Sequence, residues 1–424
     1  MNQNTEEQPN SGEPIRVLHV LGTLNRGGAE SRIMDLYRAM DRSRVQFDFL
    51  VHYPLTGADR KNGLLTSEEL MRVRPPQDFD EEVLALGGRI YALPRFTGRN
   101  FFRYRKAVRL FFSRHHEFAA AEGHMTSMAS VYLPIAKRAG VPLTVAHARS
   151  AGVDAGLRGR VTRIFRASLP QRCDVMLACS EEAGISVFGS KAMHEGRVHL
   201  VPNAVPCREF AFDPAQRAAI RSEYGIDDDE IVLGHVGRFD FMKNQSFLAG
   251  VLQEAAAQKP DLPFRMIFVG EGAKREAVRE AFQKAGLGER VIFAGSCSRE
   301  RTRAMYQAFD LFLFPSLFEG LPGTVVEAQS AGLPCFLSDQ ITREVGLTPL
   351  VHFLPIGEAG SWAVPVAEAM EDVHLHADKR KERSDRAVTA LQDAGFDSGV
   401  LAGRMEQFYL SGGKVLPVST GEHR

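Results

Sequence analysis

Two loops in the second half of the chain carry side chains that could bind a phosphate or a sugar. Arg238 and Lys243 follow the apolar run 231–236, and together these two cations could neutralise a pyrophosphate. Glu271 stands between two glycines after the run 264–269, where a ligand could approach the backbone closely. The alternative is that the cations are solvated surface charges and that the glycines form a simple turn.

A third loop follows the run 310–314, contains Glu319 and leads into a helix expected to begin near Thr324. Because the first amides of a helix have no intrahelical acceptor, a phosphate would be well placed there. Glu319 could then coordinate sugar hydroxyls. Glu327 has a structural alternative, since Thr324-x-x-Glu327 matches the capping box that stabilises a helix start.

The first half of the chain offers a second set of polar residues after apolar runs. Gly27 and Gly28 follow the first run and could admit an oxygen-rich ligand, although a tight turn also explains them. His124 and His147 each come after an apolar stretch, and Arg149 lies next to His147. A lone histidine is usually structural, but two at strand ends favour a functional role.

The elements that must position these residues alternate between strand and helix. The pattern predicts strands at 15–21, 45–51, 89–93, 143–146, 174–178, 198–201, 231–236, 264–269, 291–294, 310–314 and 334–337. It predicts helices at 29–40, 131–139, 161–169, 273–285 and 324–331. This alternation is typical of an α/β fold in which helices cover both faces of a parallel sheet.

The chain has 424 residues, which is too long for one ordinary core. A proline-containing connector near residue 205 separates two doubly wound, Rossmann-like domains, predicted at 15–205 and 206–396. Residues 1–14 are predicted to be a disordered tail, and 397–412 a helix that packs back on the first domain. Ligands of such folds bind beyond the carboxyl ends of the strands, so we expect an interdomain cleft.

Composition excludes several classes of protein. Basic and acidic residues balance at 52 each, so nothing overall indicates a nucleic-acid partner. Five cysteines without a Cys-x-x-Cys spacing indicate reduced thiols in the cytoplasm. We find neither a signal-peptide pattern at the start nor an apolar run long enough to span a bilayer.

A basic stretch at 89–114 contains eight Lys or Arg and no acidic residue, with phenylalanines interleaved. Such a segment could contact an anionic membrane from the cytoplasmic side. The alternative is an amphipathic helix whose phenylalanines belong to the core and whose basic side chains are solvated.

The ordered set Arg238-x4-Lys243, Gly270-Glu271-Gly272 and Glu319-x7-Glu327 resembles the retaining glycosyltransferases of family 4, which have the GT-B fold. The closer resemblance is to bacterial transferases that build exopolysaccharide and capsule. It extends over nearly the whole chain, from about residue 15 to residue 410.

The resemblance implies that Arg238 and Lys243 hold the donor pyrophosphate and that Glu319 faces the donor sugar. Glu327 would bind the nucleotide ribose, and His147 would approach the reacting carbon. His124 and Arg149 are assigned to the acceptor side. The other implied donor contacts are Gly27, Gly28, Glu271, Gly295, Leu321, Pro322, Gly323 and Thr324.

The predicted reaction is transfer of a hexose from a nucleotide diphosphate sugar, UDP rather than GDP, to a glycan or lipid-linked acceptor. No cofactor and no metal are expected, because the two cations would take the role of a metal. Two alternatives stay open, a nucleotide-sugar epimerase of the same fold and a non-catalytic scaffold that binds a nucleotide sugar. A nicotinamide dehydrogenase is less well supported, because the Gly-x-Gly-x-x-Gly fingerprint is missing after the first strand.

Overall fold

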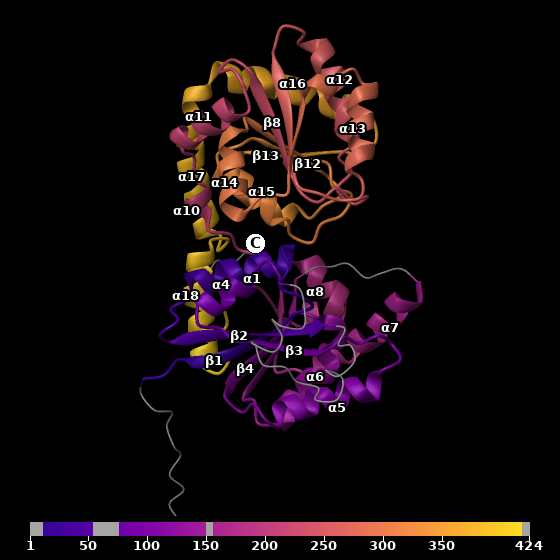
Figure 1. Cartoon of the computed structure of the whole chain (residues 1–424), viewed down its shortest axis with the longest axis vertical. Helices are drawn as coiled ribbons and strands as arrows, with labels where there is room; N and C mark the ends of the chain where they lie inside the picture. Colours follow the sequence, from indigo (N-terminus) through magenta and orange to yellow (C-terminus); the bar gives the residue numbers. More distant parts are fainter. Residues whose placement is uncertain (1–11, 54–75, 150–155, 418–424) are drawn as a thin grey trace, which may run out of the picture. The chain divides into compact units, whose positions relative to one another are not determined.

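The computed structural model describes residues 12–53, 76–149 and 156–417 (Figure 1). Most of the predicted tail at 1–14 lies outside these residues. The chain forms two compact units. Of the described residues, unit 1 contains those up to Val201 together with 401–417, and unit 2 contains Pro202–Val400.

Unit 1 is built on a parallel sheet with the strand order β3-β2-β1-β4-β5-β6-β7. Its strands are β1 Ile15–Val20, β2 Val45–Tyr53, β3 Ile90–Pro94, β4 Phe118–Gly123, β5 Leu143–Ala148, β6 Val175–Ala178 and β7 Val198–Leu200. Its helices are α1 Gly28–Ala39, α4 Asp80–Ala85, α5 Phe101–Phe112, α6 Thr126–Arg138, α7 Gly156–Ala167, α8 Glu181–Phe188, α9 Ser190–His194 and most of α18 Ser398–Leu410, with a short 3-10 turn at Leu169–Gln171.

Unit 2 has a second parallel sheet with the order β10-β9-β8-β11-β12-β13. Its strands are β8 Ile231–Val236, β9 Phe264–Val269, β10 Val291–Gly295, β11 Leu311–Phe314, β12 Cys335–Ser338 and β13 Val351–Leu354. Its helices are α10 Cys207–Phe210, α11 Pro214–Glu223, α12 Phe247–Gln258, α13 Arg275–Lys284, α14 Arg299–Ala308, α15 Gly323–Ser330, α16 Gly360–Leu375 and α17 Arg380–Asp393. Helices α12, α13 and α16 lie on one face of this sheet, and α11, α14, α15 and α17 lie on the other (Figure 1).

The central strands are apolar because helices cover both faces of each sheet. A polar side chain buried in such a strand needs hydrogen-bond partners within the protein, as Asp48 shows. Asp48 of β2 is fully buried, and it accepts hydrogen bonds from the Arg16 side chain at 2.7 and 2.5 Å and from the Arg89 amide at 2.7 Å. Hydrogen bonds of this kind offset the cost of burying a polar side chain within the sheet.

Each sheet has a point at which the strand order reverses. In unit 1 it lies between β1 and β4, and in unit 2 between β8 and β11. Loops that leave the carboxyl ends of such a strand pair run in opposite directions and leave a crevice in which α/β proteins bind ligands. Most of the residues singled out in the sequence follow these strands, so the fold gives them a common location within each unit.

Within the described residues, no helix is both long and apolar enough to cross a membrane.

Candidate functional site

An ion pair joins the two loops at the strand reversal of unit 2. Lys243, after β8, places Nζ 2.6 Å from Oε1 of Glu319, after β11, and each side chain is 18% exposed. The same Nζ lies 4.7 Å from the centre of the Phe314 ring. The ammonium group therefore rests between a carboxylate and an aromatic face, where a second anion could reach it only by competing with Glu319.

Arg238 lies in the same loop as Lys243 but is differently placed. Its side chain is exposed and has no ion-pair or hydrogen-bond partner in the described part of the chain, whereas its backbone oxygen accepts a hydrogen bond from Gln245 at 2.9 Å. The backbone is thus fixed and the guanidinium is available to an anion, which it can bind through two parallel N–H donors.

Helix α15 begins in the loop that contains Glu319. Its N-cap residue is Pro322, and no side chain caps the helix start. Because the first amides of a helix lack intrahelical acceptors and carry the positive end of the helix dipole, this start suits a phosphate. Ser316 and Thr324 lie close to this helix start in the sequence. Their hydroxyl groups are buried and have no hydrogen-bond partner among the residues that the structure describes.

The capping-box interpretation of Thr324 and Glu327 is wrong. Thr324 is the second residue of α15 rather than its N-cap, so Glu327 does not lie at the capping position. Glu327 is instead buried, and its Oε2 accepts a hydrogen bond of 2.9 Å from the hydroxyl of Tyr306 on α14. The helix begins at Gly323 and not at Thr324, because Pro322 occupies the N-cap position. A proline has no backbone N–H for a glutamate side chain to cap. A role for Glu327 in binding the ribose stays a prediction.

Two substitutions separate ribose binding by Glu327 from packing. Glu327→Gln keeps the side-chain shape and can still accept from Tyr306, so we expect little change in melting temperature. Loss of the charge should weaken UDP binding about tenfold, measured by calorimetry. Tyr306→Phe is the matched control, because it removes the hydroxyl that bonds to Glu327 and to the Thr324 oxygen and leaves the carboxylate. A lower melting temperature of Glu327→Gln with unchanged UDP affinity would assign Glu327 to packing.

The glycines beside Glu271 are explained by the protein's own backbone. A Cβ on Gly270 would lie 2.2 Å from the oxygen of Gly237, and a Cβ on Gly272 would lie 2.2 Å from the oxygen of Phe239. Both glycines also have positive φ, 139° and 157°. The loop after β8 therefore packs directly on the loop after β9 and holds Arg238 and Lys243 in place. Close approach of a ligand is not needed to explain these glycines.

Glu271 itself pairs with Arg275 at 3.1 Å and is half exposed. Gly295, at the end of β10, has a φ of 72°, and its ideal Cβ position is 3.3 Å from Oε1 of Glu271. Glu271, in the loop after β9, and Gly295, at the end of the adjacent strand β10, are thus neighbours, and their donor contacts stay predictions. Leu321 and Pro322 are buried in the loop before α15, whereas Gly323 is half-buried.

The two predicted histidines of unit 1, His124 and His147, lie beside Glu122, a residue that the sequence analysis did not identify. Glu122 of β4 is fully buried, and its Oε1 accepts a hydrogen bond of 2.7 Å from Nδ1 of His147. Its Oε2 accepts one of 2.5 Å from the hydroxyl of Tyr409 on α18. The structure also corrects the position of His147, which lies inside β5 and not after it, because β5 continues to Ala148. His147 is fully buried.

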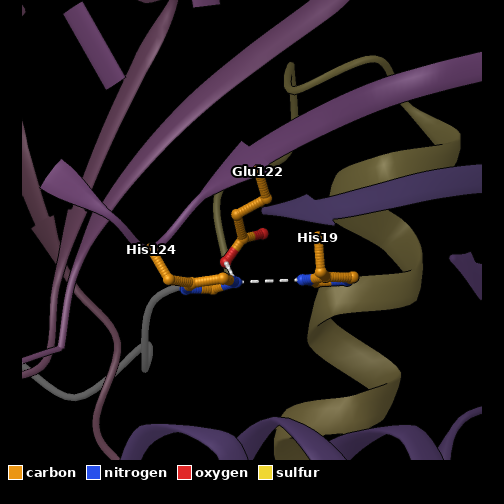
Figure 2. Close-up of side chains that lie close together, drawn as sticks. All are labelled: His19, Glu122 and His124. Atoms are coloured by element: carbon orange, nitrogen blue, oxygen red, sulfur yellow. Dashed lines mark hydrogen bonds and ion pairs between the residues drawn. The ribbon is translucent and has the colours of Figure 1, made fainter. Parts of the chain in front are cut away.

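Figure 2 shows the other half of this cluster. Nδ1 of His19, in β1, lies 3.0 Å from Nε2 of His124, directly after β4, and the two rings are nearly parallel, 7° apart. His124 is also 3.6 Å from Oε1 of Glu122. Arg149 is almost buried, with Nε 3.5 Å from Nδ1 of His124 and a terminal nitrogen 3.9 Å from Glu122. His124, His147 and Arg149 are therefore brought together as one polar cluster.

The cluster keeps its imidazoles neutral. Burial, with a smaller contribution from the nearby Arg149 guanidinium, lowers the pKa of His19 and of His147 from 6.5 to about 4, although the Glu122 carboxylate opposes the shift. Burial also lowers the pKa of His124. Burial opposes ionisation of Glu122, but the hydrogen bond from His147 holds its pKa well below the usual value.

These pKa shifts predict a pH dependence of folding. The unfolded chain protonates His19 and His147 below pH 6.5, whereas the folded chain resists protonation until about pH 4. The free energy of unfolding should thus fall as the pH drops through this window, by up to roughly 3 kcal/mol for each imidazole. Urea unfolding curves across the window measure this effect. A flat free energy between pH 6.5 and pH 4 would contradict the neutral assignment.

His19, Glu122 and His124 form a group that could hold a metal, since one ligand atom of each lies within 4.8 Å of the others. Histidine nitrogen with carboxylate oxygen suits zinc in general. Here, however, both carboxylate oxygens already accept hydrogen bonds, the two imidazoles bond to each other, and Arg149 adds a positive charge. The residues present are better suited to an internal hydrogen-bond network than to a cation.

Gly27 is the N-cap of α1, and Gly28 is its first residue; they follow β1 as predicted. A Cβ on Gly27 would meet only the end of the Glu30 side chain, and a Cβ on Gly28 would meet nothing within 4 Å. Neither glycine is thus required by packing of the described chain. Open space at a helix start is compatible with a ligand there.

Two parallel-sheet, Rossmann-like units, each with polar residues after its central strands, have the GT-B fold. Residues 216–345 match the family model described as "Glycosyl transferases group 1". The Bacillus subtilis (strain 168) protein EpsF, a glycosyltransferase by name, is 34% identical over 360 residues, which cover 84% of this chain and 87% of EpsF. The chain therefore belongs to this glycosyltransferase family.

Two further comparisons bear on the fold and on the kind of substrate. The crystal structure of Anabaena Alr3699/HepE in complex with UDP and glucose has a TM-score of 0.68 at 17% identity and covers 94% of this chain and 100% of that chain. An Escherichia coli protein named UDP-Gal:alpha-D-GlcNAc-diphosphoundecaprenol alpha-1,3-galactosyltransferase is 27% identical over 215 residues, 48% of this chain and 53% of the relative. The likeness to HepE establishes the fold. UDP and glucose are the molecules bound in that crystal structure, and the name of the Escherichia coli protein states UDP-Gal as its donor.

Proposed function

We propose that this glycosyltransferase moves a hexose from UDP-sugar to a glycan or lipid-linked acceptor with retention of configuration, as a step in surface polysaccharide synthesis. The main support for the proposal is the Lys243–Glu319 ion pair at the strand reversal of unit 2. Glu319 lies in the loop that leads into α15. Arg238, without a partner in the described chain, completes a positive site for a diphosphate. The relatives' printed ligands, UDP with glucose and a UDP-galactose donor, support the choice of UDP.

The proposed chemistry needs these groups because negative charge grows on the leaving diphosphate. The bond from the anomeric carbon to the phosphate oxygen breaks, and its electron pair stays on UDP. The acceptor oxygen bonds to the same carbon on the same face and passes its proton to the departing phosphate oxygen. Arg238, Lys243 and the first amides of α15 would stabilise the new charge, and Glu319 would hold the sugar hydroxyls.

The proposal is tested by a thermal-shift screen with nucleoside diphosphates and nucleotide sugars, followed by NMR analysis of the product. Binding to the folded state raises the melting temperature by mass action. We expect UDP and one UDP-sugar to give the largest shifts, and the product to have the donor's anomeric configuration. Free sugar released without an acceptor would favour the epimerase, and binding without turnover would favour the scaffold.

Metal independence is part of the proposal. The positive charge that a metal would supply to the diphosphate is available from Arg238 and Lys243. Turnover should therefore be unchanged after dialysis against EDTA, measured as UDP release with and without added magnesium or manganese. Loss of turnover that either ion restores would contradict this prediction.

The proposed place of action is the cytoplasm. The five cysteines of the chain show no Cys-x-x-Cys spacing, which is typical of a protein that stays reduced.

A further inference from the structure

The loop that carries the two cations of unit 2 ends in two consecutive carboxamides. Asn244 and Gln245 directly follow Lys243 and precede helix α12, which begins at Phe247. Each side chain donates a hydrogen bond to a backbone oxygen of this strand-end region. A carboxamide donates and accepts hydrogen bonds but carries no charge, so it can hold a backbone in place without neutralising a cation beside it.

The backbone of Asn244 has an unusual conformation. Its φ of 53° lies in the left-handed region, and among the residues that the structure describes it is the non-glycine residue with a positive φ. Asparagine tolerates this region better than most residues, but glycine adopts it without steric cost. The turn therefore explains why the position excludes most side chains, and it does not explain why a carboxamide is present. Uncommon backbone conformations of this kind cluster at functional sites.

The Asn244 carboxamide connects two loops. Its Nδ2 donates a hydrogen bond of 3.3 Å to the oxygen of Pro315, in the loop after β11. One residue before Lys243, the Met242 oxygen accepts a hydrogen bond of 2.7 Å from the Leu317 amide of that same loop. Lys243 thus lies between two hydrogen bonds that join the loops after β8 and β11. These bonds set the backbone position from which the Lys243 side chain reaches an anion.

Gln245 holds the backbone of the other cation. It is 1% exposed, and its Nε2 donates a hydrogen bond of 2.9 Å to the oxygen of Arg238. Its Oε1 is buried and has no hydrogen-bond partner in the part of the chain that the structure describes. Because a buried amide oxygen without a partner is costly, stability alone would favour an apolar residue here. The Arg238 oxygen would still have a partner, since it also accepts from the Asp240 amide at 3.0 Å.

We propose that Asn244 and Gln245 are positioning residues of the donor site, one for each cation. Asn244 fixes the backbone of Lys243 against the loop after β11. Gln245 fixes the backbone of Arg238. Both cations then meet the diphosphate from set positions, so little reorganisation is needed as charge develops on the leaving group. The inference rests on the proposed function, because the diphosphate is the anion to be met, and neither carboxamide is assigned a contact with the ligand.

Asn244→Gly tests the first of these roles, because glycine keeps the positive φ and removes the carboxamide. We expect a melting temperature close to that of the wild type. Calorimetry should show UDP binding weakened about fivefold, the factor that one ordinary hydrogen bond is worth. Ser246→Ala is the matched control, since Ser246 is exposed and its side chain does not cap α12. It should change neither quantity.

Double variants show whether Asn244 acts through its neighbouring cation. In a Lys243→Met background, Asn244→Gly should cause no further loss of UDP affinity, because no ammonium group is left to be positioned. A second loss of the same size in that background would overturn the assignment of Asn244 to Lys243. A lower melting temperature of Asn244→Gly with unchanged UDP affinity would make Asn244 a structural brace and overturn it as well.

Gln245→Met tests the second role, because methionine is of similar length and removes both the donor and the unpartnered oxygen. We expect the melting temperature to stay the same or rise. Turnover, measured as UDP release, should fall about fivefold. The same change in an Arg238→Ala background should cost nothing further. A lower melting temperature with normal turnover would overturn the role of Gln245.

Amide hydrogen exchange tests the connection between the loops without any nucleotide. The Leu317 amide, which is bonded to the Met242 oxygen, reports whether the two loops stay together. It should exchange about fivefold faster in Asn244→Gly and at the wild-type rate in Ser246→Ala. Unchanged exchange in Asn244→Gly would overturn the connection. If exchange responds as expected but the wild type binds no UDP, the proposed function fails and the connection between the loops stands.

Discussion

Replacing Arg238 with alanine should lower turnover about a hundredfold, the loss typical of removing one preorganised donor from a developing negative charge. The structure gives the reason for expecting so large an effect. The guanidinium is exposed and has no partner in the described chain, so its removal breaks no internal contact that could affect folding. The loss would therefore come from the diphosphate alone. UDP release from UDP-sugar in the presence of acceptor measures it.

A conservative variant and a control variant help to interpret the result for Arg238→Ala. Arg238→Lys keeps one charge but loses the planar fork, and we expect it to recover only part of the turnover. Arg386→Ala is the control, since Arg386 is an exposed arginine of α17 whose ion-pair partner among the described residues is Glu382 of the same helix. It should leave turnover and melting temperature unchanged. Near-normal turnover of Arg238→Ala would remove Arg238 from the mechanism.

Most strands were predictable because a strand buried on both faces must be a short apolar run with a polar boundary. The runs at 231–236 and 264–269 coincide with β8 and β9, and the residues that follow them were predicted as site residues for the same reason. Strand β4 was not predicted. It consists of Phe, three Ala, Glu and Gly, a composition with little strand preference, so it is specified by its place between β1 and β5.

The polar cluster of unit 1 could not be derived in full from sequence. Glu122 lies in the unrecognised strand β4, and its partner Tyr409 is 287 positions away. His19 reads as one polar residue in an apolar run, and the register that sets it opposite Glu122 is a property of the folded sheet. His235 is a similar case, buried in β8 with Nδ1 2.8 Å from the Leu313 oxygen. A histidine inside an apolar strand was the signal available for both.

Local motifs predicted chemistry less well than strand ends did. The Thr-x-x-Glu match near α15 failed because a capping box depends on where the helix begins, and Pro322 set that point. The glycines beside Glu271 were ambiguous because a ligand and a neighbouring loop make the same steric demand. Sequence shows that a side chain would not fit at such a position, but only the folded chain shows which atoms occupy the space.

Glu319 gives the most direct test of how the ion pair works. In the structure its carboxylate holds the Lys243 ammonium at 2.6 Å, so a diphosphate and Glu319 would compete for the same cation. Glu319→Gln keeps the side-chain size but removes this competition. We expect UDP to bind as tightly as before or more tightly, because Lys243 is released to the phosphate. Turnover should nevertheless fall between tenfold and about a hundredfold, since a charged hydrogen bond to the donor sugar is lost.

The prediction for Glu319→Gln is specific because UDP affinity should stay the same or rise while turnover falls. A carboxylate that only braced the loop would lower UDP affinity and turnover together when changed to an amide. Calorimetry with UDP and turnover of UDP-sugar, run on the same preparation, separate the two cases. Lys243→Met is the matched variant, because it removes the other half of the pair and should weaken UDP binding and turnover alike. If Glu319→Gln reproduced that pattern, Glu319 would act through Lys243 and not on the sugar.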